Sequence, residues 1–263
     1  MNCRICKQST NKIFNHLVLN KYLVDYYFCA NCKFIQTEDP YWLNEAYQNP
    51  IGTIDTGIIK RNLLFTKRAA TLLYFLFDKN KKYLDFGGGY GLFVRMMRDV
   101  GFDFYWEDKF TENLVSKGFD FSNNEIEIEL LTSFECFEHF INPVEEMITL
   151  LQKSNNILFS TQLFHNQPPK PAEWWYYNFE GGQHISLYSK QTLLQIAKIF
   201  NLNLYTDNRG FHLLSKKNII NNIFIILVKF SQLGLFSFIK LMMNSKTESD
   251  MNYLKTLTTT QKK

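Results

Sequence analysis

The sequence predicts an α/β fold: a mostly parallel sheet with helices on both faces, a small cysteine-rich ribbon before it and a helical tail after it. Three observations favour this fold. Four cysteines form two C-x-x-C pairs near the start, strand-like apolar runs alternate with helical repeats from residue 58 to residue 214, and a glycine-rich turn follows the first run. We expect a ribbon over 1–48, a main domain over 49–215 and a tail over 216–263.

The composition limits the class of protein. At 263 residues the chain holds one ordinary domain and small appendages, and its 46% of apolar residues can form a substantial core. The net charge of +4 is too mild to indicate a nucleic-acid partner. Residues 1–4 do not open a signal peptide, so we expect a cytoplasmic protein, in which paired cysteines more often bind metal than form disulfides.

The cysteine pairs predict a zinc site with four thiolates. Cys3 and Cys6 form one pair, Cys29 and Cys32 form the other, and 22 residues separate the pairs. Each pair offers two thiolates from one tight turn, and a tetrahedral Zn²⁺ needs two such turns facing each other. A redox role for either pair is the alternative.

The glycine-rich turn predicts a site for a nucleotide-like cofactor. It joins an expected strand over 83–86 to an expected helix over 92–100, and its glycines are Gly87, Gly88, Gly89 and Gly91. Glycines permit unusual dihedral angles and leave the backbone bare enough for a ligand. Asp108 follows the next expected strand, 21 residues beyond Gly87, which is close to the spacing of an acid that binds ribose hydroxyls. A purely structural turn and a solvated carboxylate are the alternatives.

Preceded by Asp85, this turn has the form D-x-G-x-G and resembles the first motif of the class I S-adenosylmethionine (SAM)-dependent methyltransferases. The resemblance implies a Rossmann-like sheet, with Asp85 near the amino-acid end of SAM, the four glycines along it and Asp108 on its ribose. A later stretch, 135–139, resembles the E-x-x-E-H segment of the same family, which implies that Phe134 and Glu135 lie beside the cofactor. His139 in this segment is more simply explained as a structural residue.

An aromatic stretch predicts the acceptor site. Four rings stand between a proline-rich loop and a diglycine, which is not a periodic core pattern, and they are Trp174, Trp175, Tyr176 and Tyr177. Flat amphipathic rings suit stacking on sugars. His184 follows them, and imidazole is well suited to remove a proton near neutral pH. We predict that His184 binds the substrate and acts as catalytic base, with Tyr188 or Glu138 as substitutes; a structural role is the alternative for each.

Three features together indicate a resemblance to a smaller group within this family. They are the ribbon, the glycine turn and the H-x-S-x-Y-S segment that starts at His184. They are similar to methyltransferase-23-like bacterial enzymes of surface-polysaccharide and deoxysugar clusters, including C-methyltransferases of nucleotide-linked keto-deoxysugars. The resemblance implies methyl transfer to a sugar or sugar nucleotide. The large carboxy-terminal domain of those C-methyltransferases has no counterpart here, which leaves the keto-sugar acceptor in doubt.

Two other functions stay open. An RNA or protein methyltransferase would use the ribbon to bind its substrate, and a non-catalytic scaffold would bind SAM without turnover. The basic residues of the ribbon are few and not clustered, and the target-base motif N-P-P-[YF] is absent after the fourth expected strand. Both observations weigh against a nucleic-acid partner.

The remaining segments are expected to be structural. A linker over 49–57 ends in Asp55, Thr56 and Gly57, a stretch that could cap a helix over 58–77. Arg61 and Asn62 in this helix are candidate site residues. We expect a short third strand near 118–121, a helix capped by Asn142 and a helix over 191–200 capped by Ser189.

The tail has apolar residues at helical spacing over 218–243. Its longest unbroken apolar run, 223–228, is too short to cross a bilayer, so we expect no transmembrane segment and a packed helical pair or a homodimer surface. Residues 247–263 are polar and expected to be frayed.

Overall fold

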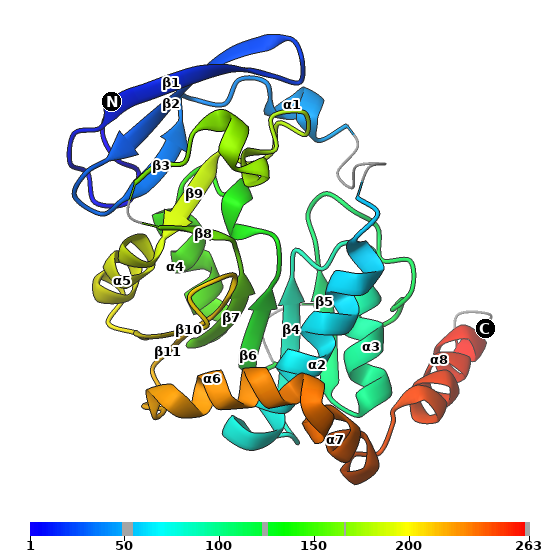
Figure 1. Cartoon of the computed structure of the whole chain (residues 1–263). Helices are drawn as coiled ribbons and strands as arrows, with labels where there is room; N and C mark the ends of the chain where they lie inside the picture. Colours follow the sequence, from blue (N-terminus) through cyan, green and yellow to red (C-terminus); the bar gives the residue numbers. More distant parts are fainter. Residues whose placement is uncertain (49–54, 123–125, 166, 261–263) are drawn as a thin grey trace. The chain divides into compact units, whose positions relative to one another are not determined.

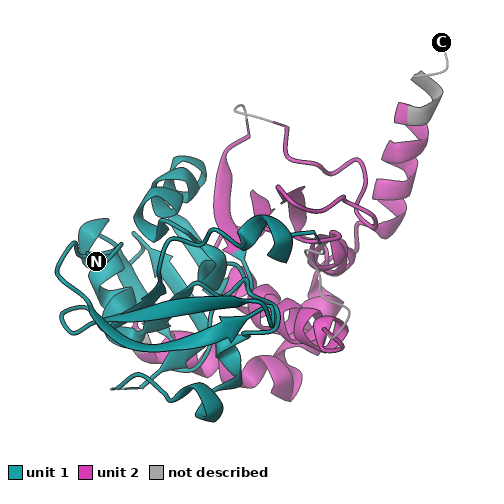
Figure 2. Cartoon of the chain, turned by 90° about the horizontal axis from the view of Figure 1, so that it is seen from above, with its two compact units in different colours: residues 1–54, 133–218 teal, residues 55–132, 219–263 magenta. Residues whose placement is uncertain are grey.

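The structure is a computed structural model that describes residues 1–48, 55–122, 126–165 and 167–260. The chain forms two compact units, which Figure 2 shows in different colours. Unit 1 contains residues 1–54 and 133–218, and unit 2 contains residues 55–132 and 219–263. Each unit therefore joins segments that are distant in sequence. Most of the expected linker lies outside the described residues.

The ribbon of unit 1 continues into a larger sheet. The hairpin β1 (Asn11–Val18) and β2 (Tyr22–Cys29) pairs with β3 (Phe34–Thr37), and β3 pairs antiparallel with β9 (Ser186–Ser189). The strand order is β1-β2-β3-β9-β8, with β8 at Leu163–Phe164 and the short helix α1 at Leu43–Ala46 (Figure 1). The ribbon is therefore built into unit 1 by strand pairing.

The rest of unit 1 combines antiparallel strands and helices. The strands β7 (Asn156–Ser160), β11 (Phe211–Ser215) and β10 (Asn203–Thr206) pair in that order. The helices are α4 (Pro143–Lys153) and α5 (Lys190–Ile199), with short 3-10 turns η1 (Phe137–His139), η2 (Pro171–Glu173) and η3 (Trp175–Tyr177).

Two capping expectations in unit 1 have different outcomes. Ser189 caps α5 as expected, because its hydroxyl accepts from the backbone N–H of Thr192 at 3.2 Å in a capping box. Asn142 precedes α4, but its side chain makes no capping hydrogen bond. The first-turn proline Pro143, whose φ suits a helix start, is the remaining local signal there.

Unit 2 contains a parallel sheet in the order β5-β4-β6, with β4 at Lys82–Phe86, β5 at Asp103–Glu107 and β6 at Ile128–Ser133. The helices α2 (Ile58–Leu76) and α3 (Leu92–Val100) pack beside it (Figure 1). This parallel sheet flanked by helices confirms the predicted α/β class. The expected third strand near 118–121 is reduced to one parallel bridge, from Asp120 to Trp106 on β5.

The cap of α2 lies within the expected stretch 55–57. Gly57 occupies the cap position, without a side-chain hydrogen bond. The carboxylate of Asp55 instead binds the guanidinium of Arg61 through two hydrogen bonds, of 2.8 and 2.6 Å. Asn62 donates its amide to the carbonyl of Ile58 at 2.8 Å. Both candidate site residues of this helix are therefore engaged in local contacts.

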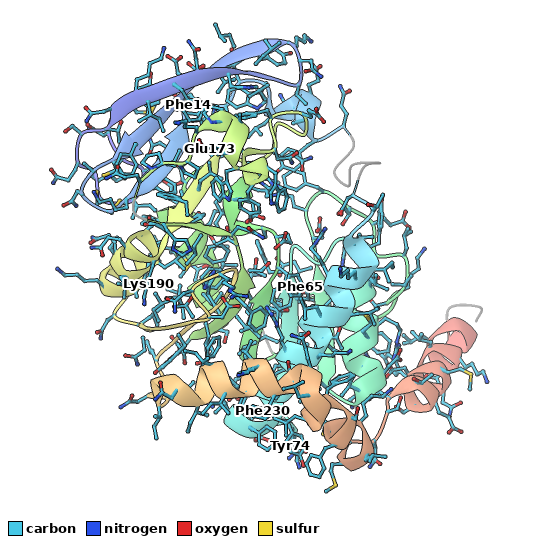
Figure 3. All side chains as sticks on the ribbon, in the orientation of Figure 1. Phe14, Phe65, Tyr74, Glu173, Lys190 and Phe230 are labelled. Atoms are coloured by element: carbon cyan, nitrogen blue, oxygen red, sulfur yellow. The ribbon has the colours of Figure 1, made fainter. Side chains whose placement is uncertain are left out.

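The tail of unit 2 is helical and largely apolar on its exposed side. It contains α6 (Asn221–Phe230), the π turn η4 (Ser231–Leu235) and α7 (Phe236–Met242). By length and composition alone, 222–242 could cross a membrane: its mean hydropathy is 1.8 and 28% of the apolar stretch is buried. The length of the longest unbroken apolar run, 223–228, therefore underestimates how hydrophobic this helical segment is. Non-helical dihedral angles at Leu233 and Gly234 kink the path, and Phe230 marks its exposed side in Figure 3.

Residues 247–260 are not frayed. They form the helix α8 (Thr247–Thr260), whose Asp250 is buried and binds the guanidinium of Arg98 on α3. The polar sequence concealed this contact, because the buried partner lies 152 positions away.

Candidate functional site

The glycine turn follows β4 in unit 2. Gly87, Gly89 and Gly91 have φ of 70°, 53° and 83°, values at which a side chain is strained. The amides of Gly87 and Gly88 donate to the carbonyl of Glu107 at 2.9 and 3.3 Å, which holds the turn at the end of β5.

Asp108 binds the backbone of this turn and of the loop that follows β5. Its Oδ2 accepts from the amide of Gly89 at 2.9 Å, and its Oδ1 accepts from the amides of Phe110 and Thr111 at 2.7 and 2.9 Å. A carboxylate has about four acceptor positions, so three amides leave capacity for a hydroxyl group. The acid after β5 and the turn after β4 therefore form one local structure at the carboxyl edge of two parallel strands.

Asp85 lies beneath the turn and is 3% exposed. The hydroxyl of Thr132 donates to its Oδ1 at 2.6 Å. Burial raises the pKa of Asp85 to about 7; the hydrogen bond from Thr132 opposes this rise and the charge of Asp108 adds to it. A side chain at Gly88 would come within 2.9 Å of Oδ2 of Asp85 and 2.7 Å of the ring of Trp106, so only glycine fits.

The structure adds contacts that the motif did not reveal. A side chain at Gly91 would collide with Ser116 and Asn113, so the packing of that loop requires this glycine. The indole of Trp106 and the hydroxyl of Thr111 both donate to the carbonyl of Gly89 at 2.8 Å. The sequence offered no signal for these two residues beyond their closeness to Asp108.

A second cluster lies in unit 1. Glu138, His139 and His184 bring one ligand atom each within 4.8 Å of one another. Glu138 is fully buried, and neither of its carboxylate oxygens has a hydrogen-bond partner. Burial, and then the charge of Glu135, raises the pKa of Glu138 to about 8. The nearby hydroxyls of Tyr176 and Thr161 offset this rise in part.

The two histidines of this cluster are held by their Nδ1 atoms. Nδ1 of His184 donates to the carbonyl of Tyr176 at 2.7 Å, so a neutral His184 carries its lone pair on Nε2. Nδ1 of His139 lies 3.0 Å from the hydroxyl of Tyr47. Burial of the ring, and then the charge of His184, lowers the pKa of His139 to about 3, so this ring is neutral at pH 7.

Tyr188 has the geometry of a structural residue. Its fully buried hydroxyl donates to the carbonyl of Phe137 at 2.9 Å. Burial, with the charge of Glu138 next, raises its pKa well above the ordinary value. A phenol that holds its proton this firmly is poorly suited to act as a base.

The aromatic stretch is divided between core and surface. Tyr176 and Tyr177 are buried in a core cluster with residues of the ribbon such as Trp42. Trp174 packs against this cluster and Trp175 is 72% exposed. Only these two tryptophans therefore remain as candidates for stacking on an acceptor.

Glu135 and Phe134 lie at the start of the E-x-x-E-H segment of unit 1. Glu135 has a φ of 52°, a strained conformation for a residue with a side chain. Its amide donates to the hydroxyl of Ser160 at 2.8 Å, and that hydroxyl donates to Oε1 of Glu135 at 2.6 Å. The ring of Phe134 stacks on Phe211.

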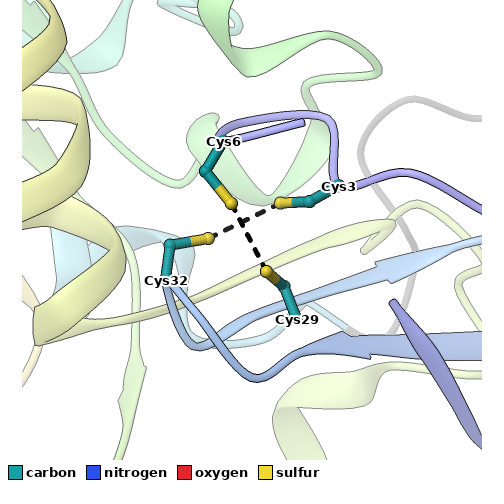
Figure 4. Close-up of side chains that lie close together, drawn as sticks. All are labelled: Cys3, Cys6, Cys29 and Cys32. Atoms are coloured by element: carbon teal, nitrogen blue, oxygen red, sulfur yellow. Dashed lines mark hydrogen bonds between the residues drawn. The ribbon is translucent and has the colours of Figure 1, made fainter. Parts of the chain in front are cut away.

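The four cysteines of the ribbon converge as predicted (Figure 4). Sγ of Cys3 lies 3.5 Å from Sγ of Cys32, and Sγ of Cys6 lies 3.4 Å from Sγ of Cys29. All four sulfur atoms lie within 4.8 Å of one another. Zn–S bonds of about 2.3 Å in a tetrahedron place sulfur atoms about 3.8 Å apart, so this group fits zinc.

The two cysteine turns share one backbone design. Lys7 and Lys33, each directly after the second cysteine of its pair, have φ of 61° and 56°. Their amides donate to the carbonyls of Cys3 and Cys29 at 3.0 and 2.9 Å. This matched geometry is what a site built from two facing turns needs.

A family model described as a methyltransferase domain matches residues 60–207, more than half of the chain. The chain belongs to this methyltransferase family. It is therefore an enzyme, a SAM-dependent methyltransferase of class I, and the glycine turn and Asp108 lie within the matched range. No curated protein matches the chain by sequence.

Three examples illustrate the solved structures that match this chain. The plantazolicin methyltransferase BpumL in complex with SAH is 14% identical over 66% of this chain and 89% of its own, with a TM-score of 0.44. OxaC in complex with SAH and oxaline is 11% identical over 66% and 54%, with a TM-score of 0.46. The mitomycin 7-O-methyltransferase MmcR is 9% identical over 66% and 59%, with a TM-score of 0.40.

Proposed function

We propose that this methyltransferase transfers the methyl group of SAM to a sugar or sugar nucleotide of surface-polysaccharide biosynthesis in the cytoplasm. The observation that carries the cofactor assignment is the contact between Gly89 and Asp108 at the edge of β4 and β5. The combination of ribbon, glycine turn and H-x-S-x-Y-S segment supports the carbohydrate acceptor, as does the exposed ring of Trp175.

In this proposal SAM lies along the glycine turn, with Asp108 on its ribose and Asp85 near its amino-acid end. Asp85 is a buried acid that accepts a hydrogen bond from Thr132 and is repelled by the charge of Asp108, so a bound ammonium group would stabilise its charge. Phe134 and Glu135 are proposed to lie beside the cofactor, where the strained backbone of Glu135 is consistent with a functional position.

His184 is the proposed catalytic base. Its hydrogen bond to Tyr176 fixes the ring and directs the basic electron pair to Nε2. The sulfonium of SAM makes the methyl carbon electrophilic, so the protein has chiefly to orient the acceptor and remove its proton. Glu138 is the substitute base, since its pKa of about 8 is close to neutral pH.

Zinc is the proposed occupant of the four cysteines, in a structural role. With all four positions of a tetrahedron taken by thiolates, none remains for a substrate. The ion would join the start of the chain to the end of β2, next to the strand β3 that pairs with β9.

A pair of variants tests the assignment of the site. We expect Asp108→Asn, which keeps one acceptor oxygen, to weaken SAM binding by about 10- to 100-fold, because a charged hydrogen bond to a ribose hydroxyl is lost. We expect His184→Ala to leave SAM affinity unchanged and to lower turnover at least about 100-fold. Calorimetry with SAM and release of SAH with a panel of nucleotide-linked hexoses and deoxyhexoses measure the two effects.

The outcomes separate the alternatives. SAM binding without SAH release on any sugar nucleotide, but with release on RNA or protein, would replace the carbohydrate acceptor. SAM binding without release on any acceptor would favour a scaffold. Normal turnover of His184→Ala would remove His184 from the chemistry.

We further propose that a second copy of the chain covers the exposed apolar side of the tail. Leu241 and Leu233 are 85% and 67% exposed, and exposed patches of this kind often mark interfaces. Light scattering should give twice the chain mass of 31.2 kDa, and Leu241→Lys should shift it toward the monomer. Tyr41→Lys, at an exposed aromatic residue of unit 1, is the control and should stay dimeric. A monomeric native protein would contradict the proposal.

A further inference from the structure

We propose that Glu138, His139 and His184 form a site for a divalent transition-metal cation that binds the acceptor oxygen. This inference rests on the proposed methyl transfer, and within it the role of His184 changes from base to metal ligand. It concerns a second metal site, separate in position and in ligand chemistry from the four cysteines.

The first support is the set of donors. Two imidazoles and one carboxylate offer ligand atoms within 4.8 Å of one another, which matches the spread of ligands around one ion. Nitrogen and carboxylate donors together suit Mn²⁺, Fe²⁺, Co²⁺ and Zn²⁺. Three protein ligands leave coordination positions open, as catalytic metal sites require.

The second support is the environment of Glu138. Its side chain is fully buried and both oxygens lack hydrogen-bond partners. Buried polar groups are normally paired, and a buried carboxylate is paired or coordinates a metal. A cation between Glu138 and the two histidines would satisfy this carboxylate, which no described side chain does.

The third support is the hydrogen-bonding environment of the Nδ1 atoms of His184 and His139, the ring nitrogens that would not bind the metal. A histidine that binds a metal usually donates its other ring N–H to a carbonyl or a similar acceptor, which fixes the tautomer and the ring. His184 does this through Nδ1 and the carbonyl of Tyr176 at 2.7 Å. His139 has the hydroxyl of Tyr47 at 3.0 Å from its Nδ1.

The accessibility of the cluster suits a substrate site. Glu138 is buried, whereas both histidines are partly exposed, so the cluster opens on its histidine side. An acceptor that approaches from that side would meet the open positions of the ion.

The chemistry follows from the charge of the ion. A cation held by Glu138, His139 and His184 would favour loss of the proton from an acceptor hydroxyl group to solvent water. The acceptor oxygen would then attack the methyl carbon of SAM, and the electron pair of the broken C–S bond would stay on sulfur, which gives the methyl ether and neutral SAH. His184 here acts as a ligand, whereas in a metal-free enzyme it would take the proton itself.

Binding of Mn²⁺ tests the site directly. Mn²⁺ prefers oxygen and nitrogen donors, so protein already loaded with zinc at its cysteines is titrated with Mn²⁺ and free Mn²⁺ is followed by electron paramagnetic resonance. We expect one Mn²⁺ per chain, and at least about tenfold weaker binding in Glu138→Gln and in His184→Ala. His165→Ala, at an exposed histidine of unit 1 outside the cluster, should bind as the native protein does.

Turnover provides the second readout. Dialysis against a chelator, with the retained cysteine-bound zinc confirmed by atomic emission, should abolish SAH release and leave SAM affinity unchanged, and Mn²⁺ should restore release. The absence of stoichiometric Mn²⁺ binding, or equal binding in Glu138→Gln with a native circular dichroism spectrum, would overturn the proposal. Full turnover after chelation would overturn it too, while leaving the methyltransferase with His184 as base. Loss of SAM binding would contradict the proposed function alone, because the Mn²⁺ titration does not depend on it.

Discussion

Replacement of Cys29 by serine should remove zinc from the chain and unfold the ribbon. Cys29 is fully buried at the end of β2, and its sulfur lies 3.4 Å from that of Cys6. Structural zinc sites bind with apparent free energies of about 10 to 16 kcal/mol at neutral pH, and much of this is folding free energy. The loss of one thiolate should therefore lower the melting temperature strongly.

The effect should extend beyond the ribbon. β3 pairs with β9, and Trp42 packs in one core cluster with Tyr176 and Tyr177. Near-ultraviolet circular dichroism, which reports packed aromatic rings, should therefore lose signal together with the zinc measured by atomic emission.

Cys136→Ser provides the matched control. Cys136 is the fifth cysteine and lies outside the converging group, so this variant should keep one zinc per chain. Stoichiometric zinc and a native melting temperature in Cys29→Ser would refute the zinc site. Disulfides found by thiol titration of the native protein would instead favour the redox alternative.

The features that the sequence predicts well are those whose partners are close in the chain. The spacing from Gly87 to Asp108 is set by one strand, one helix and the next strand, so parallel pairing brings the acid to the turn. The C-x-x-C pairs likewise each fix two ligands in one turn. Local spacing therefore predicted two arrangements: the closeness of Asp108 to the glycine turn and the convergence of the four cysteine sulfur atoms.

The features that the sequence does not predict depend on distant partners. Tyr176 and Tyr177 have amphipathic rings, and the pairing of β3 with β9 places them in a core shared with the ribbon. The role of Glu138 depends on the position of His184, which lies on a different segment. Neither arrangement leaves a periodic signal, since it arises only when separate segments pack.

The helix α8 shows the same limit. Its polar sequence predicts fraying, but Nε and Nη2 of Arg98 donate to the two carboxylate oxygens of Asp250, each at 2.8 Å. Nη1 of Arg98 also donates to Asp103 at 2.7 Å and to the carbonyl of Phe104 at 2.8 Å. Arg98 and Asp250 are 4% and 5% exposed, so this ion pair is buried.

We expect Asp250→Ala to destabilise unit 2 by about 3 kcal/mol and to release α8. Removal of one partner from a buried ion pair leaves an undercompensated charge, which is strongly unfavourable. Arg98 keeps its bond to Asp103, which places the effect at the lower end of the usual range. Thermal unfolding and hydrogen exchange of 247–260 measure the two effects. Glu248→Ala, at an exposed acid in the same turn, should change neither.

The destabilisation by Asp250→Ala should depend on pH. Burial acts to raise the pKa of Asp250, but the hydrogen bonds and charge of Arg98 outweigh it and hold the pKa below its ordinary value. A carboxyl group with a lowered pKa in the folded state contributes stability above its unfolded pKa of about 3.9 and loses it as the pH falls through the folded pKa. The difference in melting temperature between native protein and variant should therefore be full at pH 7 and shrink below about pH 4. A difference that stays constant into acid would show that the carboxylate charge of Asp250 does not hold α8 in place.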